Sequence, residues 1–253
     1  MNLLMEVIEQ DAGKSKVVLF DRPGLEQAYD LGTSGIRGTI TVNRRTFTIA
    51  GTKLYEVLAS GTANFLGSVI SDGLPVSMAG GVSKIFFASS GQPYVLDLSV
   101  SPPALSTIPA SQLGATVLMV GYCAGFFLAL MSNGQIFASD VEDPTSWDGA
   151  STTRVNTFSD NATSIFSDHL EMWVFGPKAI QVYSLTGGTP FPFDANLSGF
   201  IEHGLAAPFS IAKADNSIFW LEGDDRGNGV VRRANGYNPS RVSDHALEYE
   251  LSQ

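Results

Sequence analysis

The hydrophobic positions of this sequence form five pairs of short apolar runs, and a polar turn joins the two runs of each pair. In the third pair, Phe126–Leu130 is followed by the turn Ser132–Gly134 and then by Ile136–Ala138. Apolar runs of this length, bounded by Gly, Ser and Asn, are typical of buried strands. The five predicted hairpins cover residues 47–57, 85–96, 126–138, 172–183 and 218–231.

The second strand of each predicted hairpin is centred on an aromatic or branched residue, which serves as the anchor of a repeat. The anchors are Tyr55, Tyr94, Phe137, Tyr183 and Val231. They recur at intervals of about 40 to 50 residues, the period of propeller blades, each of which is a small four-stranded sheet. We therefore predict an all-β, β-propeller-like array in which each hairpin is the middle of one blade. A β-sandwich or a mixed meander is the alternative, because hairpins occur at such spacings there too.

Residues 1–34 stand apart from this repeat and are predicted to be an N-terminal arm, whereas residues 35–253 form the blades. Within the arm, Val17–Phe20 is expected to be a short strand and Arg22–Gly24 a turn. The arm as a whole is expected to pair with the first or last blade. The first residues carry neither a basic region nor a small-residue cleavage site. We expect the chain not to be secreted.

Composition adds limits on function. The formal charge of −10 and the pI near 4.6 argue against a dedicated DNA-binding domain. The longest apolar stretch, residues 115–130, is interrupted by Gly121 and Gly125 and is shorter than the ~20 residues of a membrane span. We interpret it as two core strands that bury the single Cys123.

Candidate chemistry is sparse, and we predict no enzyme activity, no cofactor and no metal. The three histidines, His169, His203 and His245, lie far apart in sequence and lack a tight metal-ligand spacing. They are interpreted as surface turn residues, with a metal site built from several blades as the alternative. The phosphate-binding loops and the nucleophile elbow are also missing from the sequence.

Two further segments are interpreted as turns. Gly223–Gly229 resembles a cation-binding loop, but it lacks the alternating aspartates and terminal glutamate of an EF-hand. In Ser139–Gly149, Trp147 is expected to fold back and anchor the loop. This segment resembles the turns of sialidase-like propellers without matching their order. The adjacent arginines Arg44-Arg45 and Arg232-Arg233 are expected to point to opposite faces of a strand, which gives a sugar-acid hydrolase little support.

The order of several motifs resembles the packaged-DNA stabilisation proteins of podoviruses. The most specific stretch runs from Trp173 to Gly187 and ends in Tyr183-Ser184-Leu185-Thr186-Gly187. The other matching motifs are Pro23-Gly24, Arg37-Gly38, Ala50–Tyr55, Val76–Gly81, Ser139-Asp140, Asp143–Trp147 and Gly204–Pro208.

This resemblance implies a virion protein of a short-tailed phage, made in the bacterial cytoplasm and located in the tail. Members look like β-propellers that form a tail hub or nozzle, a ring that we expect to be a hexamer. The ring closes the DNA channel below the portal and its adaptor and carries tail fibres or spikes. It encloses DNA without sequence-specific binding, and no membrane is involved. Family members are nearly twice as long, so we leave open whether the blades close into a ring within this chain.

A glycan-acting or glycan-binding β-propeller is the alternative function. It requires carboxylates or arginines clustered at one end of the propeller. The acidic composition agrees with a conduit that lets DNA slide, because basic walls would bind phosphate through counterion release.

Overall fold

The computed structural model describes residues 3–7, 17–21, 24, 26–27, 29–33, 35–157, 159–223 and 229–251. The chain forms two compact units, residues 1–32 and 33–253. Among the helices of the described residues, none has the length and apolar character needed to cross a bilayer.

The first unit contains a two-stranded antiparallel sheet made by β1 (Leu3–Val7) and β2 (Val17–Asp21). Met5 lies opposite Leu19 in its register. Strand β2 covers the predicted strand, and it pairs with β1, which was not predicted. Pairing of the arm with the first or last blade stays a prediction. Arg22 and Pro23 of the predicted turn lie outside the described residues.

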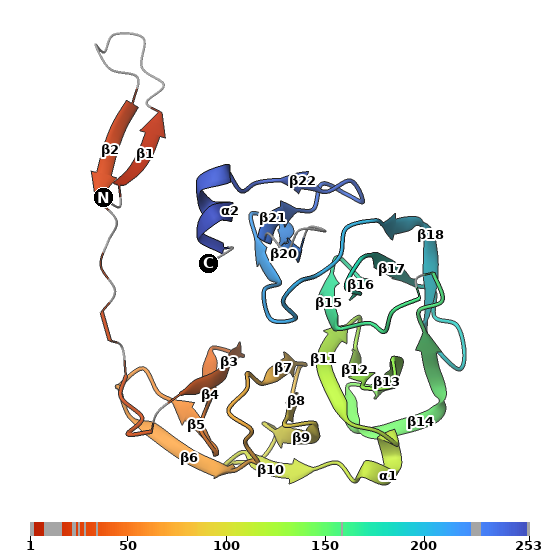
Figure 1. Ribbon diagram of the computed structural model, residues 1–253. Helices are drawn as coiled ribbons and strands as arrows, with labels where there is room; N and C mark the ends of the chain where they lie inside the picture. The colour runs from red at the N-terminus through yellow and green to blue at the C-terminus, as the bar shows by residue number, and fades with distance from the viewer. Residues whose placement is uncertain are drawn as a thin grey trace. The chain divides into compact units, whose positions relative to one another are not determined.

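The second unit consists of five four-stranded antiparallel sheets arranged around a ring, as Figure 1 shows, and is a five-bladed β-propeller. The all-β prediction is confirmed. Each blade uses four strands that are consecutive along the chain.

The strands of the five blades, in chain order, have the following bounds. Blade 1 contains β3 (Ile36–Val42), β4 (Arg45–Ala50), β5 (Lys53–Val57) and β6 (Ala63–Ser68). Blade 2 contains β7 (Ser77–Gly80), β8 (Lys84–Ser89), β9 (Gln92–Asp97) and β10 (Ala104–Thr107). Blade 3 contains β11 (Val117–Cys123), β12 (Phe126–Met131), β13 (Gln135–Val141) and β14 (Asp143–Arg154). Blade 4 contains β15 (Ser164–Asp168), β16 (Glu171–Phe175), β17 (Ile180–Leu185) and β18 (Phe193–Ile201). Blade 5 contains β19 (Ala212–Ala214), β20 (Ser217–Gly223), β21 (Gly229–Arg233) and β22 (Ser240–Arg241).

The five predicted hairpins are the two middle strands of the five blades, from β4–β5 to β20–β21. The predicted core strands within residues 115–130 are β11 and β12. Two short helices accompany the blades, α1 (Ala110–Leu113) and α2 (His245–Leu251), and neither was predicted from the sequence.

The first two strands of several blades are joined by two-residue turns with positive φ. Asn43 and Arg44 have φ of 51° and 63°, and the turns His169-Leu170 and Asp215-Asn216 repeat this conformation. Such turns follow the right-handed twist of the paired strands. We call the end of the propeller that carries them the turn face. The opposite end, which carries the links between blades at residues 69–76, 108–116, 155–163 and 202–211, is the connection face.

Four apolar clusters lie between successive blades. The cluster between blades 1 and 2 is centred on Phe47 and Phe87, and the next is centred on Phe86 and Phe127. Alternate residues of strand β8 therefore pack against blade 1 and against blade 3, which explains why β8 is apolar at consecutive positions. The remaining clusters join blades 3 and 4 and blades 4 and 5. No corresponding cluster between blades 5 and 1 occurs among the described residues.

Candidate functional site

The axis of the propeller contains a cavity of about 330 Å³ whose wall includes residues of blades 1 to 4 and of the link that leads to blade 5. The innermost strands supply Thr39, Ser77, Met119 and Ile165, and the link before β19 supplies Phe209. Ser77 is held by Val120, whose backbone N–H donates to its hydroxyl at 2.9 Å. None of the residues that line this cavity is charged. The cavity therefore offers apolar surface and hydroxyl groups, but no acid or base.

A second cavity of about 440 Å³ opens beside the axis on the connection face. It is mainly apolar, and Leu74, Leu118 and Phe209 in its wall are 61%, 42% and 50% exposed. Its one ionisable residue is Asp72, whose pKa is lowered chiefly by a hydrogen bond from the backbone N–H of Leu74. Gly91 lines this cavity at φ +78°, where an added Cβ would lie 2.2 Å from Thr116. The cavity could receive an apolar group, but its wall has no pair of side chains arranged for proton transfer.

Arg37 fixes the first link between blades. Its side chain is only 4% exposed, and it forms an ion pair with Asp72 at 3.0 Å. The guanidinium also donates to the backbone carbonyls of Leu74, Ile70 and Gly51 at 2.7, 3.2 and 3.1 Å, and to the Ser89 hydroxyl at 2.9 Å. Arg37 therefore ties blade 1, the link 69–76 and the end of β8 together. Arg37, which belongs to the Arg37-Gly38 motif, therefore has a structural role.

Polar contacts also cross between blades on the turn face. Lys84 of blade 2 forms an ion pair with Asp143 of blade 3 at 2.6 Å. The Glu142 carboxylate accepts hydrogen bonds from the backbone N–H of Val82 at 3.1 Å and from the Tyr122 hydroxyl. These contacts connect the turn-face ends of blades 2 and 3.

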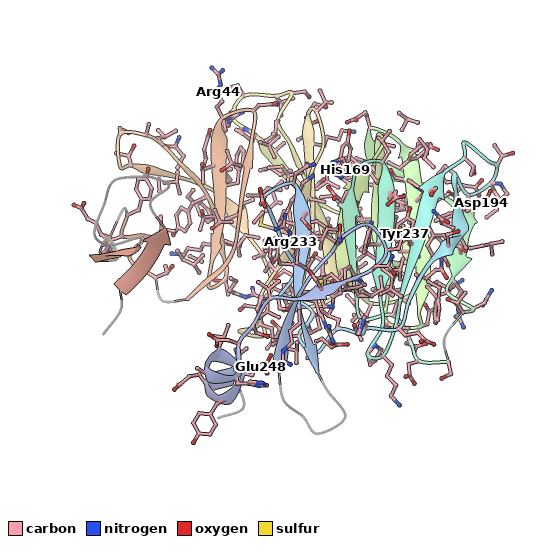
Figure 2. All side chains as sticks on the ribbon, turned by 90° about the horizontal axis from the view of Figure 1, so that it is seen from above. Arg44, His169, Asp194, Arg233, Tyr237 and Glu248 are labelled. Atoms are coloured by element: carbon pink, nitrogen blue, oxygen red, sulfur yellow. The ribbon has the colours of Figure 1, made fainter. Side chains whose placement is uncertain are left out.

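An equivalent set connects blades 4 and 5. Tyr237 donates its hydroxyl proton to Glu171 and accepts a hydrogen bond from the Asn196 amide at 3.0 Å. Lys213 forms an ion pair with Asp168. Figure 2 labels Tyr237 and His169 on this part of the propeller. The ionisable groups described here bind to groups of the neighbouring blade, and they therefore stabilise the contacts between blades.

The two phenol–carboxylate pairs predict a loss of stability at alkaline pH. Burial, followed by the hydrogen bond to Glu142, raises the pKa of Tyr122 to about 12, and the hydrogen bond to Glu171 raises that of Tyr237 to about 12. A tyrosine whose pKa is higher in the folded state than in the unfolded state stabilises the fold. This stabilisation is fully present below the unfolded-state pKa near 10, and it is lost as the pH rises through the folded-state pKa of about 12. Urea unfolding from pH 9 to 12 should show this decrease. In the double variant Tyr122→Phe, Tyr237→Phe the decrease should be smaller, and an identical pH profile would contradict the role of these phenols.

The structure keeps the three predicted histidines apart. His169 lies in the β15–β16 turn, 57% exposed at its side chain, and contacts Asp168 at 2.8 Å. His245 is 92% exposed at the start of α2. His203, which is partly buried, contacts Glu222 at 2.6 Å, and Glu222 also binds Arg232 at 2.6 Å. No group of three or more His, Cys, Asp or Glu suited to a metal ion occurs in the described part of the chain.

The other predicted residues take the following positions. Trp147 is partly buried, donates its indole N–H to the Pro144 carbonyl at 2.6 Å and lies 5.3 Å from the Phe86 ring of blade 2. The predicted loop Ser139–Gly149 is wrong, because Ser139–Val141 belong to β13 and Asp143–Gly149 to β14, with only Glu142 in a turn. Trp147 therefore lies in a strand, and its ring packs against the neighbouring blade. Cys123 is buried, which raises the pKa of its thiol to about 11. Residues 224–228 of the predicted turn Gly223–Gly229 lie outside the described residues, and Gly223 pairs with Gly229 across β20 and β21.

The arginine pairs correct one expectation. Arg44 lies in a turn and not in a strand, and Figure 2 shows it at the edge of the blades. Its neighbour Arg45 binds Glu56 at 2.6 Å. Arg232 and Arg233 do lie in β21, and they bind Glu222 and Asp215. These paired guanidinium groups are not gathered into a site for an acidic sugar.

Sequence reasoning missed the apolar cavity of the connection face and the role of Arg37. The cavity wall includes residues of all four links between blades, which are far apart in sequence. Arg37 was noted only as part of an Arg-Gly motif, and its carboxylate partner lies 35 residues away. The sequence contains no local signal for either feature.

Three solved structures of low sequence identity align with this chain, and one of them is described as a β-propeller domain. A virginiamycin B lyase from Staphylococcus aureus aligns with a TM-score of 0.58 and 9% identity, over 96% of this chain and 78% of that chain. Cps50 (Swd1) of Myceliophteria thermophila aligns with a TM-score of 0.59 and 12% identity, over 82% and 72%. AztD of Citrobacter koseri aligns with a TM-score of 0.53 and 11% identity, over 90% and 76%. At these identities the likeness shows the fold alone.

Sequence comparison gives the family. No curated protein matches the chain. A family model described as "Bacteriophage P22 Gp10, beta-propeller" matches residues 1–253. The chain therefore belongs to the phage-stabilisation family of the bacteriophage P22 Gp10 β-propeller, as its motifs indicated.

Proposed function

We propose that this chain is the tail hub, or nozzle, of a short-tailed phage. Copies assemble into a ring of six below the portal and its adaptor, close the DNA channel and carry the tail fibres or spikes. The observation that carries this proposal is the family match over all 253 residues, in a family of phage structural proteins that stabilise packaged DNA.

The use of the polar side chains supports a structural role. The buried Arg37 and the turn-face pairs Lys84–Asp143 and Tyr237–Glu171 all hold neighbouring blades together. A hub must resist distortion when packed DNA presses on it, and polar contacts between blades oppose sliding of one sheet over the next.

The charge distribution supports an enclosing role without tight binding of DNA. Arg45, Arg232 and Arg241 form ion pairs with Glu56, Glu222 and Glu248. A guanidinium that is already paired with a carboxylate contributes less to phosphate binding through counterion release. Together with the net charge of −10, this favours a wall past which DNA can slide.

The position of the protein in the virion tests the proposal. Purified virions labelled with an antibody to this chain and imaged by electron microscopy should carry the label at the tail vertex alone. An antibody to the capsid protein should label the whole shell in the same preparation. Label spread over the capsid, or virions free of the protein, would exclude a tail hub.

A further inference from the structure

The apolar cavity of the connection face continues outward along the end of blade 2. A neighbouring cavity of about 410 Å³ shares Ser90, Gly91 and Thr116 with it and extends to Leu113. At its other end the first cavity reaches Phe209, which also lines the cavity at the axis. We call the two cavities together the connection-face groove. A groove of this form suits an elongated occupant.

The groove lies inside the array of blades. Its walls are the connection-face ends of blades 2 and 3 and residues of the four links between blades. Blades 2 and 3 each pack against a neighbouring blade on both sides. The first link, residues 69–76, is held by the buried Arg37. The shape of the groove is therefore set by contacts within the chain.

The rim of the groove is apolar and exposed. In addition to Leu74, Leu118 and Phe209, the rim includes Ile70, which is 49% exposed. Exposed apolar residues gathered around a cavity are typical of a surface that contacts another protein. A free small molecule inside the cavity would leave most of this rim in water. The rim therefore favours a segment of a partner protein as the occupant.

Asp72 determines the charge of this occupant, because it is the one ionisable residue in the walls of the groove. Its Oδ1 accepts hydrogen bonds from Arg37 Nη2 at 3.0 Å and from the backbone N–H of Leu74 at 2.9 Å. The Ser90 hydroxyl lies beside the same carboxylate and lowers its pKa further. A carboxylate offers about four lone-pair sites, so these three donors leave capacity for one more. The side chain of Asp72 is 40% exposed and can be reached by a cation.

The existing contacts of Asp72 favour an ammonium group over a second guanidinium. A guanidinium binds a carboxylate best through both oxygens, and Oδ1 already binds Arg37. An ammonium is a compact point charge that needs a single acceptor. The stem of a lysine can also cover apolar surface while its charged end stays at the water boundary. Leu74, next to Asp72 in the cavity wall, supplies such a surface.

We propose that the connection-face groove binds an extended segment of a partner protein, in which a lysine places its ammonium group on Asp72. An apolar side chain next to this lysine fills the part of the groove lined by Leu118 and Phe209. The proposal rests on the proposed function in one respect, which is that the partner is another virion protein. It assigns the connection face to this partner and names the chemistry of the contact.

Three peptides test the contact with the purified full chain. The probe is acetyl-ALKLA-amide, and the two comparison peptides carry norleucine or glutamate in place of the lysine. Binding is measured by ligand-observed NMR. Because a hydrogen bond to a charged group is lost, the norleucine peptide should bind on the order of tenfold more weakly than the lysine peptide. The glutamate peptide should bind more weakly still, since its charge is repelled by Asp72.

Two variants and a matched control locate the binding. Asp72→Asn should lose the preference for lysine over norleucine. Leu118→Glu, which leaves the contacts of Asp72 intact, should weaken binding of the norleucine peptide at least about tenfold, as expected for a charge placed in an apolar contact. Asp194→Asn is the control, because Asp194 is an exposed carboxylate on β18 of blade 4, labelled in Figure 2, and this variant should bind like the wild type. Thermal unfolding of each variant shows whether the blades remain folded.

Several outcomes would overturn the proposal. These are no binding of the lysine peptide, equal binding of the lysine and norleucine peptides, and an unchanged preference in Asp72→Asn. Hexylamine that binds as tightly as the lysine peptide would show that the groove takes a small amine and that no partner segment is needed. If the peptides fail while the protein is located at the tail vertex, the groove contact is wrong and the hub function stands. If the peptides bind as expected and virions lack the protein, the hub function is wrong.

Discussion

Phage particles assembled without this chain are expected to fill with DNA and then to lose it. Packaging is driven from the portal side, so particles that lack this chain should still fill with DNA. Duplex DNA carries one negative charge per ~1.7 Å of its axis, and densely packed DNA therefore repels itself strongly. Retention then requires a large closed interface between subunits and not a tight DNA-binding site.

The measurement is the amount of nuclease-protected DNA per particle, followed over time after packaging. Addition of the purified chain to filled particles should preserve the DNA. The single variants His169→Ala, His203→Ala and His245→Ala should retain DNA like the wild type, because these residues lie apart from one another. Particles that keep their DNA in the absence of the chain would refute the hub function. A single histidine change that abolishes infection while assembly is normal would instead indicate a site-based activity.

Substitution of Arg37 is expected to have the largest effect on stability. Arg37→Ala removes five hydrogen-bond donations and leaves the Ser89 hydroxyl and three backbone carbonyls short of a donor at the junction of blades 1 and 2. Loss of one partner from a buried ion pair costs about 3–5 kcal/mol. Because Asp72 is 40% exposed and can regain water, we expect a value near the lower end, about 3 kcal/mol.

Urea unfolding of the variant and the wild type measures this difference. Lys53→Ala is the control, since Lys53 is an exposed cation in β5 of the same blade and its loss should change stability by less than about 0.5 kcal/mol. Asp72→Asn should cost less than Arg37→Ala, because it keeps the buried donors with their carbonyl partners. Equal stability of Arg37→Ala and Lys53→Ala would show that the link 69–76 does not depend on the guanidinium.

The two middle strands of each blade could be predicted from the sequence, whereas β11 was the only first or last strand of a blade that was predicted. Phe126–Met131 is apolar at every position because alternate residues face two different blades. In contrast, β6 (ANFLGS) and β10 (ALST) are short and largely exposed, so their sequences lack a strand period. The short helix α2 was missed for a similar reason, since one turn or two of helix gives little periodicity.

The polar contacts could not be predicted because they depend on which blades become neighbours. Lys84 and Asp143 are 59 residues apart, and Tyr237 and Glu171 are 66 apart. Residue type alone does not distinguish these side chains from solvated surface charges. The proposed function rests on the family resemblance, and no residue pattern in the sequence indicated it independently.

Each apolar cluster joins one blade to the next, and this arrangement determines where the protein begins to unfold. Blades 2, 3 and 4 are buried from both sides, whereas the described contacts hold blades 1 and 5 from one side only. In structures where each unit contacts only its neighbours, local unfolding begins where a unit has the fewest contacts. Amide hydrogen exchange should therefore be slowest in β12 and β16 and faster towards both ends of the array. A mechanical load on the array would then unfold the terminal blades before it reaches the central ones.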